Sequence, residues 1–198
     1  MGTALARTNR MCIGTGVTCP ILWYNPAVIA QVFATLGFMF HNRVILGMGR
    51  GESLNEIQSG NRWPPSQERF DMLKEALYLI RKLWNESWVR FKGDYYWVKD
   101  SILYTKPKMP IPIYIAGLGP QSSKLAGEQA DGYITNELNV DIIKNKLLRA
   151  LKEGATKAGK DYVSLEKVLF IPGSYNKDKN KAIESMSYWK GAMNQGLL

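Results

Sequence analysis

Residues 43–56 read RVILGMGRGESLNE, and this stretch decides the fold class. It opens with a short apolar run, residues 43–48, which has the length and composition of a buried strand. Three glycines follow within residues 47–51, where they let backbone N–H groups approach a ligand closely. The spacing is not that of a dinucleotide-binding turn, and the Lys-Ser/Thr pair of a phosphate loop is absent. The stretch predicts a tight strand-to-helix turn or a ligand site, and Glu52 and Asn55 behind the glycines favour the site.

The order of strand and then helix recurs outward from this stretch. Strands are expected at residues 10–18, 43–48, 113–116, 132–135 and 167–171, and a hairpin at residues 88–91 and 95–98. Helices are expected at residues 27–40, after Ser66, and at residues 120–130, 141–158 and 178–193. Five such units predict a parallel sheet with crossover helices, in either a doubly wound sheet or a (β/α)8 barrel. A complete barrel has about 250 residues, so a barrel built from this chain would lack roughly three strands.

Local signals indicate where two of the helices begin. Asn25 has the side chain of a good N-cap, and Pro26 suits the first helical position, where a missing N–H costs nothing. Ser66 is expected to cap the clearest amphipathic helix. The apolar face of that helix should consist of Phe70, Leu73, Leu77, Ile80 and Trp84.

Composition excludes several classes of protein. With 45% hydrophobic and 22% charged residues in 198, and without a long apolar run, the chain is neither disordered nor a membrane-spanning protein. No secretory signal is visible, and Cys12 and Cys19 form neither a metal-binding spacing nor a disulfide framework. We therefore expect the protein to be located in the reducing cytoplasm. A net charge of +9 is typical of a protein that binds an acidic ligand, a nucleic acid or an anionic membrane, but also of a solvated basic surface that binds no partner. Because the lysines of residues 144–160 and 177–190 are scattered, we expect neither nucleic acid nor membrane as a partner.

Two further glycine-rich segments resemble the first in position. Residues 14–20, GTGVTCP, and residues 116–123, AGLGPQSS, each follow an expected strand, and the second leads into a helix N-terminus. Since the carboxyl ends of parallel strands share one edge of the sheet, all three segments should meet there. This arrangement predicts one shared cofactor site.

Residues 14–56, from GTGVTCPILWYNPAVIAQVFATLG to RVILGMGRGESLNE, resemble the luciferase-like superfamily of flavin and deazaflavin oxidoreductases. Within it they are most similar to glucose-6-phosphate dehydrogenases dependent on coenzyme F420. The similarity continues at residues 63–70, 93–96, 116–119 and 130–132. The resemblance implies an α/β fold, a (β/α)8 TIM barrel that residues 1–198 form as one partial domain of about five βα units plus a hairpin.

The resemblance also implies functions for individual residues. Glu52 matches the acid/base carboxylate, and Gly16-Val17 matches a non-prolyl cis peptide that supports the deazaflavin ring. Contacts to the cofactor are implied for Gly16, Val17, Cys19, Arg50, Gly51, Asn55, Gly119, Gln121 and Ser122. Arg50 departs from the usual small residue and could meet a phosphate or the acidic tail of the coenzyme. No metal site is implied.

By the same resemblance, Met1 falls near the end of the family's second helix and the chain stops before the eighth strand. The family's histidine acid would then lie outside the chain, and His41 is expected in a solvated loop at the opposite end of the barrel. We therefore expect a partner, either a second copy or a chain that supplies the missing strands.

The leading interpretation is hydride transfer between a small substrate and coenzyme F420. The substrate would be an alcohol, a sugar phosphate or a pterin with a one-carbon unit. Residues 136–139 carry no Lys or Arg, which argues against a phosphorylated sugar. The alternatives are an FMN-dependent luciferase-like monooxygenase and a catalytically incomplete fragment that binds cofactor.

Overall fold

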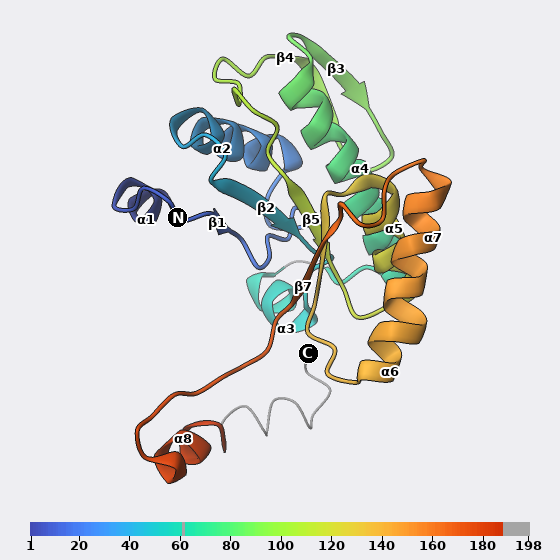
Figure 1. Ribbon diagram of the computed structural model, residues 1–198. Helices are drawn as coiled ribbons and strands as arrows, with labels where there is room; N and C mark the ends of the chain where they lie inside the picture. The colour runs from blue at the N-terminus through green and yellow to red at the C-terminus, as the bar shows by residue number, and fades with distance from the viewer. Residues whose placement is uncertain (61, 188–198) are drawn as a thin grey trace.

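The computed structural model describes residues 1–60 and 62–187, and its centre is a five-stranded parallel sheet in the order β1-β2-β5-β6-β7 (Figure 1). The strands are β1 Ile13–Gly14, β2 Val44–Met48, β5 Ile113–Ala116, β6 Gly132–Thr135 and β7 Glu166–Leu169. All four neighbouring pairs are parallel. The strands lie in chain order, without the reversal of a doubly wound sheet, so the sheet is part of a barrel.

The long helices cover one side of this sheet. They are α2 Pro26–Met39, α4 Ser66–Asn85, α5 Pro120–Gln129 and α7 Leu148–Lys157. Figure 1 shows α2 and α4 along the first strands and α5 beside α7 along the later ones. The short elements are α1 Gly2–Ala6, α3 Ser53–Glu56, η1 Ile57–Ser59, α6 Val140–Ile142, the π-helical turn η2 Ile143–Leu147 and α8 Lys179–Ser185. The antiparallel hairpin of β3 Val89–Lys92 and β4 Trp97–Ser101 lies beside α4, as expected.

Helix α4 supplies the largest block of the core. The five residues predicted for its apolar face are all buried: Phe70, Leu73, Leu77, Ile80 and Trp84. The Trp84 indole N–H also donates to the Ala30 carbonyl oxygen of α2 at 2.8 Å, so burial of the indole leaves no unsatisfied hydrogen-bond donor. Burial of each large side chain contributes about 1.5–3 kcal/mol, which anchors α4 against α2 and the sheet.

One of the two predicted helix caps is confirmed and the other is wrong. The Asn25 side chain accepts from the Ala27 N–H at 2.8 Å, with Pro26 at the first helical position. Ser66, by contrast, is the first residue of α4, Pro65 occupies the cap position, and no side chain caps the helix. The Ser66 hydroxyl is instead within 3.3 Å of the Arg50 guanidinium, which donates to it.

The first strand is shorter than residues 10–18 because a side chain interrupts the ladder. β1 has two residues, and beyond it the Thr15 hydroxyl accepts from the Gly47 N–H at 3.2 Å and lies 3.0 Å from the Gly47 carbonyl oxygen. A Cβ at Gly47 would lie 1.9 Å from the Thr15 carbonyl oxygen, so only glycine fits there. Pairing resumes at a single bridge between Thr18 and Met48.

The later helices agree with the sequence prediction in position and differ in detail. The expected helix 141–158 is the succession of α6, η2 and α7. The expected helix 178–193 begins as α8, with Asp178 as its cap, and its residues 188–193 lie outside the described part of the chain.

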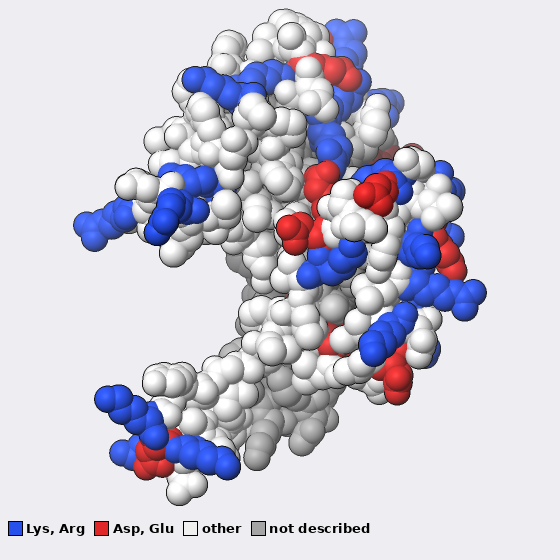
Figure 2. Space-filling model, in the orientation of Figure 1, with Lys and Arg blue, Asp and Glu red and all other residues white. Residues whose placement is uncertain are grey.

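Charged residues are distributed over the surface without one continuous basic area on the face drawn in Figure 2, where Asp and Glu lie among Lys and Arg. Within residues 1–60 and 62–187, no helix is both long and apolar enough to cross a membrane.

Candidate functional site

The three glycine-rich segments meet at a pocket of about 450 Å³ at the carboxyl edge of the sheet. Seven of the ten predicted site residues line it: Gly16, Val17, Cys19, Arg50, Gly51, Glu52 and Asn55. The other three, Gly119, Gln121 and Ser122, do not line it and belong to the cap and first turn of α5. The lining also includes six residues that were given no function from the sequence: Gly49, Glu56, Ala116, Gly117, Leu118 and Asn136. All but Asn136 lie inside the glycine-rich stretches quoted above, and that position is the sequence feature that could have identified them as part of the site.

The wall after β1 is formed by the Gly16–Val17 peptide, which is cis as the resemblance implies. Val17 packs closely over the strand-end glycines, since a Cβ at Gly49 would lie 2.8 Å from its Cγ2. At Gly16 an added Cβ would meet no atom within 4 Å, so the backbone there borders open space. This wall can therefore accept a flat group against bare backbone.

The floor of the pocket is a contact between Cys19, Gly51 and Glu56. Gly51 has a φ of +74°, and an added Cβ would lie 2.8 Å from the Cys19 Sγ and 2.9 Å from the Glu56 Oε1. Glu56 is 3% exposed, and the Cys19 thiol hydrogen-bonds to it. Burial, and next the hydrogen bond to Glu56, raise the pKa of Cys19 to about 12. The thiol is therefore protonated at neutral pH and is a wall residue rather than a nucleophile.

Glu52 is the exposed carboxylate of the pocket and lies at the N-cap position of α3. The Asn55 amide Nδ2 donates a long hydrogen bond to its Oε2 at 3.4 Å. The pocket thus has one buried carboxylate, Glu56, and one that a ligand can reach.

Arg50 joins the end of β2 to the starts of two helices. Its Nη1 donates to the Ser66 hydroxyl of α4 at 3.3 Å and to the Gln121 Oε1 of α5 at 3.4 Å. Gln121 Nε2 in turn donates to the Gln67 Oε1 at 3.0 Å, so the two helix N-termini lie side by side. Burial, and next the charge of Arg69, lower the pKa of Arg50. The pocket is therefore positive at this end.

The wall after β5 is held from below by Tyr133 of β6. The Tyr133 hydroxyl donates to the Gly117 carbonyl oxygen. Ser122 packs against Gly117, is fully buried, and its hydroxyl has no hydrogen-bond partner among the described residues. Tyr133 and Ser122 thus support the Gly117 backbone of this wall from β6 and from α5.

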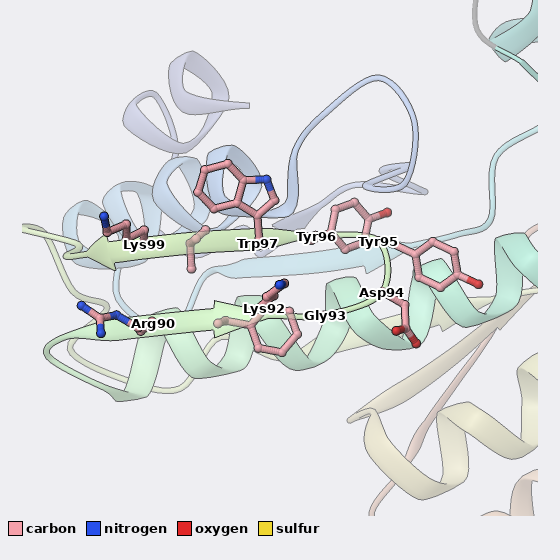
Figure 3. A pocket seen from close by; sticks show the side chains of 10 residues that line it. Arg90, Lys92, Gly93, Asp94, Tyr95, Tyr96, Trp97 and Lys99 are labelled. Atoms are coloured by element: carbon pink, nitrogen blue, oxygen red, sulfur yellow. The ribbon is translucent and has the colours of Figure 1, made fainter.

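A larger pocket, of about 710 Å³, belongs to the hairpin and contains none of the predicted residues. Figure 3 shows Asp94 and Tyr95 at its turn and Trp97 along β4. The Glu75 carboxylate of α4 accepts from the backbone N–H groups of this turn, at 2.9 Å from Asp94 and 2.7 Å from Tyr96. The hairpin is thereby fixed to α4 as structural support.

The remaining sequence predictions concern metals and histidine. Among the described residues, no group of three or more His, Cys, Asp and Glu could hold a metal ion. His41 is exposed in the turn between α2 and β2, at the amino end of β2 and away from the pocket. Its prediction as a loop residue is confirmed.

Comparison with known proteins gives consistent matches. The family described as luciferase-like monooxygenase matches residues 1–197. A protein of Amycolatopsis mediterranei (strain U-32) named F420-dependent glucose-6-phosphate dehydrogenase is 46% identical over 191 residues, which are 96% of this chain and 57% of that protein. One from Microbacterium testaceum (strain StLB037) with the same name is 44% identical over 96% of this chain and 56% of its own length.

A solved structure is similar over the whole chain. An F420-dependent secondary alcohol dehydrogenase in complex with an F420-acetone adduct superposes with a TM-score of 0.94 and 40% identity, over 100% of this chain and 60% of that one. The F420-dependent tetrahydromethanopterin reductase of Methanopyrus kandleri, 24% identical with a TM-score of 0.87, shares the fold over 97% of this chain and 58% of its own. The chain thus spans a little more than half the length of these relatives.

Proposed function

The chain belongs to the family of luciferase-like monooxygenases, and on that premise we propose that its carboxyl-edge pocket binds coenzyme F420 and serves hydride transfer with a small substrate. The observation that carries the proposal is the convergence of three glycine-rich strand ends on one pocket. Relatives named as F420-dependent dehydrogenases at 40–46% identity support it.

The residues present fit such a coenzyme. A planar ring needs a wall without side chains, and at Gly16, which lines the pocket, an added Cβ would meet no atom within 4 Å. A phosphate needs donors, and the N-terminus of α5, which follows directly on the pocket residues Gly117 and Leu118, has backbone N–H groups without helical partners. Gly16, Val17, Cys19, Gly51 and Asn55 would border the ring. Gly119, Gln121 and Ser122 would hold the phosphate.

When bound, the deazaflavin ring supplies the acceptor for a hydride from the substrate carbon. The protein positions the substrate and moves one proton. For an alcohol, the hydroxyl proton passes to the Glu52 carboxylate as the hydride leaves carbon, so a carbonyl product forms. Asn55, 3.4 Å from Glu52 Oε2, keeps the carboxylate oriented toward the substrate oxygen.

The substrate side favours an uncharged molecule over a sugar phosphate. Asn136 lines the pocket, and residues 136–139 carry an acidic residue and no cation. Glu137 Oε1 accepts from the Asn139 N–H at 2.8 Å, so this carboxylate stabilises its own loop. We propose a secondary alcohol or a pterin one-carbon unit as substrate.

The proposal includes a partner along the sheet and a cytoplasmic location. Among the described strands, β1 and β7 have one neighbour each, and Leu169, Phe170 and Ile171 at the end of β7 are about half exposed. A second copy, or a chain that adds strands, would cover them. Free thiols at Cys12 and Cys19 are consistent with a reducing compartment.

Fluorescence titration tests the cofactor, and turnover tests Glu52. The protein should bind F420 more tightly than FMN or NADP, and tighter binding of either would contradict the proposal. Glu52→Gln should lower the turnover of 2-propanol with F420 by about 10²–10⁴-fold and leave the Kd for F420 within about twofold. Glu153→Gln, in an exposed carboxylate on α7, is the matched control and should leave both unchanged.

A further inference from the structure

The short segment after β2 buries a carboxyl group and exposes its apolar side chains. Within residues 52–58, all of which the structure describes, Glu56 is the only buried residue, with 3% of its surface exposed. Leu54 and Ile57 of the same segment are 53% and 52% exposed. Proteins normally bury leucine and isoleucine and leave glutamate in water, because an enclosed carboxyl group loses its hydration. The reversed pattern indicates that specific contacts hold Glu56 inside.

Two of these contacts are with the floor of the pocket. The Cys19 thiol donates to the Glu56 carboxyl group. Gly51 has a φ of +74°, and a Cβ added there would lie 2.9 Å from the Glu56 Oε1 and 2.8 Å from the Cys19 Sγ. The chain therefore passes directly over the Glu56 carboxyl group just before it reaches Glu52.

Cys19 connects this contact to the sheet. Its neighbour Thr18 lies beside β2, where the Thr18 N–H donates to the Gly47 carbonyl oxygen at 2.8 Å and the Thr18 carbonyl oxygen accepts from the Gly49 N–H at 2.9 Å. Cys19 is half-buried and packs against the core. The Glu56 carboxyl group is thereby attached to the carboxyl end of a central strand.

The backbone carries this attachment on to Glu52. The Glu52 carbonyl oxygen accepts from the N–H groups of Asn55 at 3.1 Å and of Glu56 at 3.0 Å, which closes the α3 turn, residues 52–56. One helical turn is not stable by itself, so its position depends on the contacts of its buried side chain. Glu52 and Asn55 are exposed on this turn and line the pocket. The direction of the Glu52 side chain therefore depends on Glu56.

We propose that Glu56 is a positioning residue, which through Cys19 and the backbone of Gly51 holds the α3 turn where the Glu52 carboxylate reaches the substrate oxygen. The inference rests on the proposed function and adds to it the buried group that fixes the turn carrying Glu52. Glu56 acts through Glu52 and does not itself contact the substrate. A general base must lie within hydrogen-bond reach of the proton it takes, and a misplacement of about 1 Å can cost about 10²-fold in rate.

Two substitutions at residue 56 separate the carboxyl contacts from the volume of the side chain. Glu56→Leu keeps a buried side chain but cannot accept from the thiol. It should lower kcat for 2-propanol with F420 by about 10–100-fold and leave KM and the Kd for F420 within about threefold. Glu56→Gln keeps an acceptor oxygen, so its kcat should stay within about threefold of wild type. A Glu56→Leu protein as active as wild type would overturn the proposal, because Glu56 would then only fill space.

A double-mutant cycle tests whether Glu56 acts through Glu52. The Glu52→Gln protein has no carboxylate to orient, so adding Glu56→Leu to it should lower kcat by less than about threefold further. If the two losses multiplied instead, Glu56 would serve the fold or the ligand directly, and the proposal would be wrong.

Hydrogen exchange gives a second measurement that needs no coenzyme. The N–H groups of residues 55–57 donate within the α3 turn. Glu56→Leu should speed their exchange by about tenfold or more, because the turn loses its attachment. Glu128→Leu is the matched control, since it removes a half-buried glutamate from α5 together with its ion pair to Lys157 at 3.0 Å. It should change neither the exchange of residues 55–57 nor kcat.

The outcomes separate this inference from the proposed function. If wild type neither bound F420 nor turned over the alcohol, the proposed function would fail, and the exchange of residues 55–57 would still decide whether Glu56 holds the turn. Unchanged exchange in Glu56→Leu would overturn the inference at any level of activity. Faster exchange, together with a loss of kcat that disappears in the Glu52→Gln background, would support it.

Discussion

At the amino end of β6 the Asp131 carboxylate has partners from two elements. At the carboxyl end of β2 the Arg50 guanidinium donates, among the described residues, to the neutral side chains of Ser66 and Gln121. Asp131 Oδ2 accepts from the Ile113 N–H at 2.8 Å and from Arg81 Nη2 at 3.1 Å. Arg81 also donates to the Gln129 carbonyl oxygen at 2.9 Å. The Asp131 carboxylate thus has a cationic partner at one edge of the sheet, whereas Arg50 at the other edge is in none of the ion pairs of the described residues. The Nε of Arg81 is nevertheless buried without a hydrogen-bond partner among the described residues.

The difference teaches which edge can bind a ligand. Polar groups that hydrogen-bond to one another stabilise the fold and have few free donors or acceptors for a ligand. A cation such as Arg50, whose described hydrogen bonds go to the neutral side chains of Ser66 and Gln121, can still bind an anionic group of a ligand. Substitutions at the amino edge should therefore change stability alone, and those at the carboxyl edge should change binding.

The largest expected effect is at the amino edge. Asp131→Ala removes a charge-assisted bond to the backbone of β5 and the partner of Arg81, and should lower the free energy of unfolding by about 1–2 kcal/mol, given the partial exposure of the pair. Urea denaturation measures this, and the Kd for F420 should stay unchanged. Glu153→Ala, in an exposed pair on α7, should cost less than about 0.5 kcal/mol. An affinity loss in Asp131→Ala without a stability loss would break the comparison.

The carboxyl edge should respond in the opposite way. Ser122→Ala removes a buried hydroxyl without a described partner, so the free energy of unfolding should stay level or rise by up to about 1 kcal/mol. The Kd for F420 should rise about 2–10-fold, because the proposed hydrogen bond of the hydroxyl to the phosphate is lost. Ser123→Ala is the matched control, since the neighbouring Ser123 hydroxyl donates to the Leu147 carbonyl oxygen. It should lose stability and keep its affinity, and the same result for Ser122→Ala would contradict our assignment.

The sequence predicted the five parallel strands and the converging glycine segments, because both follow from local pattern: apolar runs, turn residues and the strand-helix alternation. The pattern left a doubly wound sheet and a barrel open, and the barrel came from the family resemblance. It did not predict the partners of the side chains. Ser66 has the composition of a cap, yet Pro65 takes that position and the hydroxyl meets Arg50. Glu56 was given no function, although it stands in the decisive stretch, because only the three-dimensional turn at Gly51 brings it to Cys19. Contacts across the sheet edge depend on chain segments far apart in sequence.

The smallest expected effect concerns Cys19 and tests whether its thiol in the floor of the pocket is packed and unreactive. Burial, and next Glu56, raise the pKa of its thiol to about 12, against 9.0 for an ordinary cysteine. Cys12, by contrast, is exposed. A raised folded-state pKa gives stability that is present below about pH 9 and lost as the pH rises from about 9 to 12.

At pH 8 iodoacetamide should therefore alkylate Cys12 in the folded protein and spare Cys19, while both react in urea, as mass spectrometry of the peptides would measure. Cys19→Ser should keep the Kd for F420 within about threefold, because the residue packs against the ligand without ionising. Fast alkylation of folded Cys19 at pH 8 would show a thiolate at the floor of the pocket, and the carboxyl edge would then hold a reactive group in addition to an anion site.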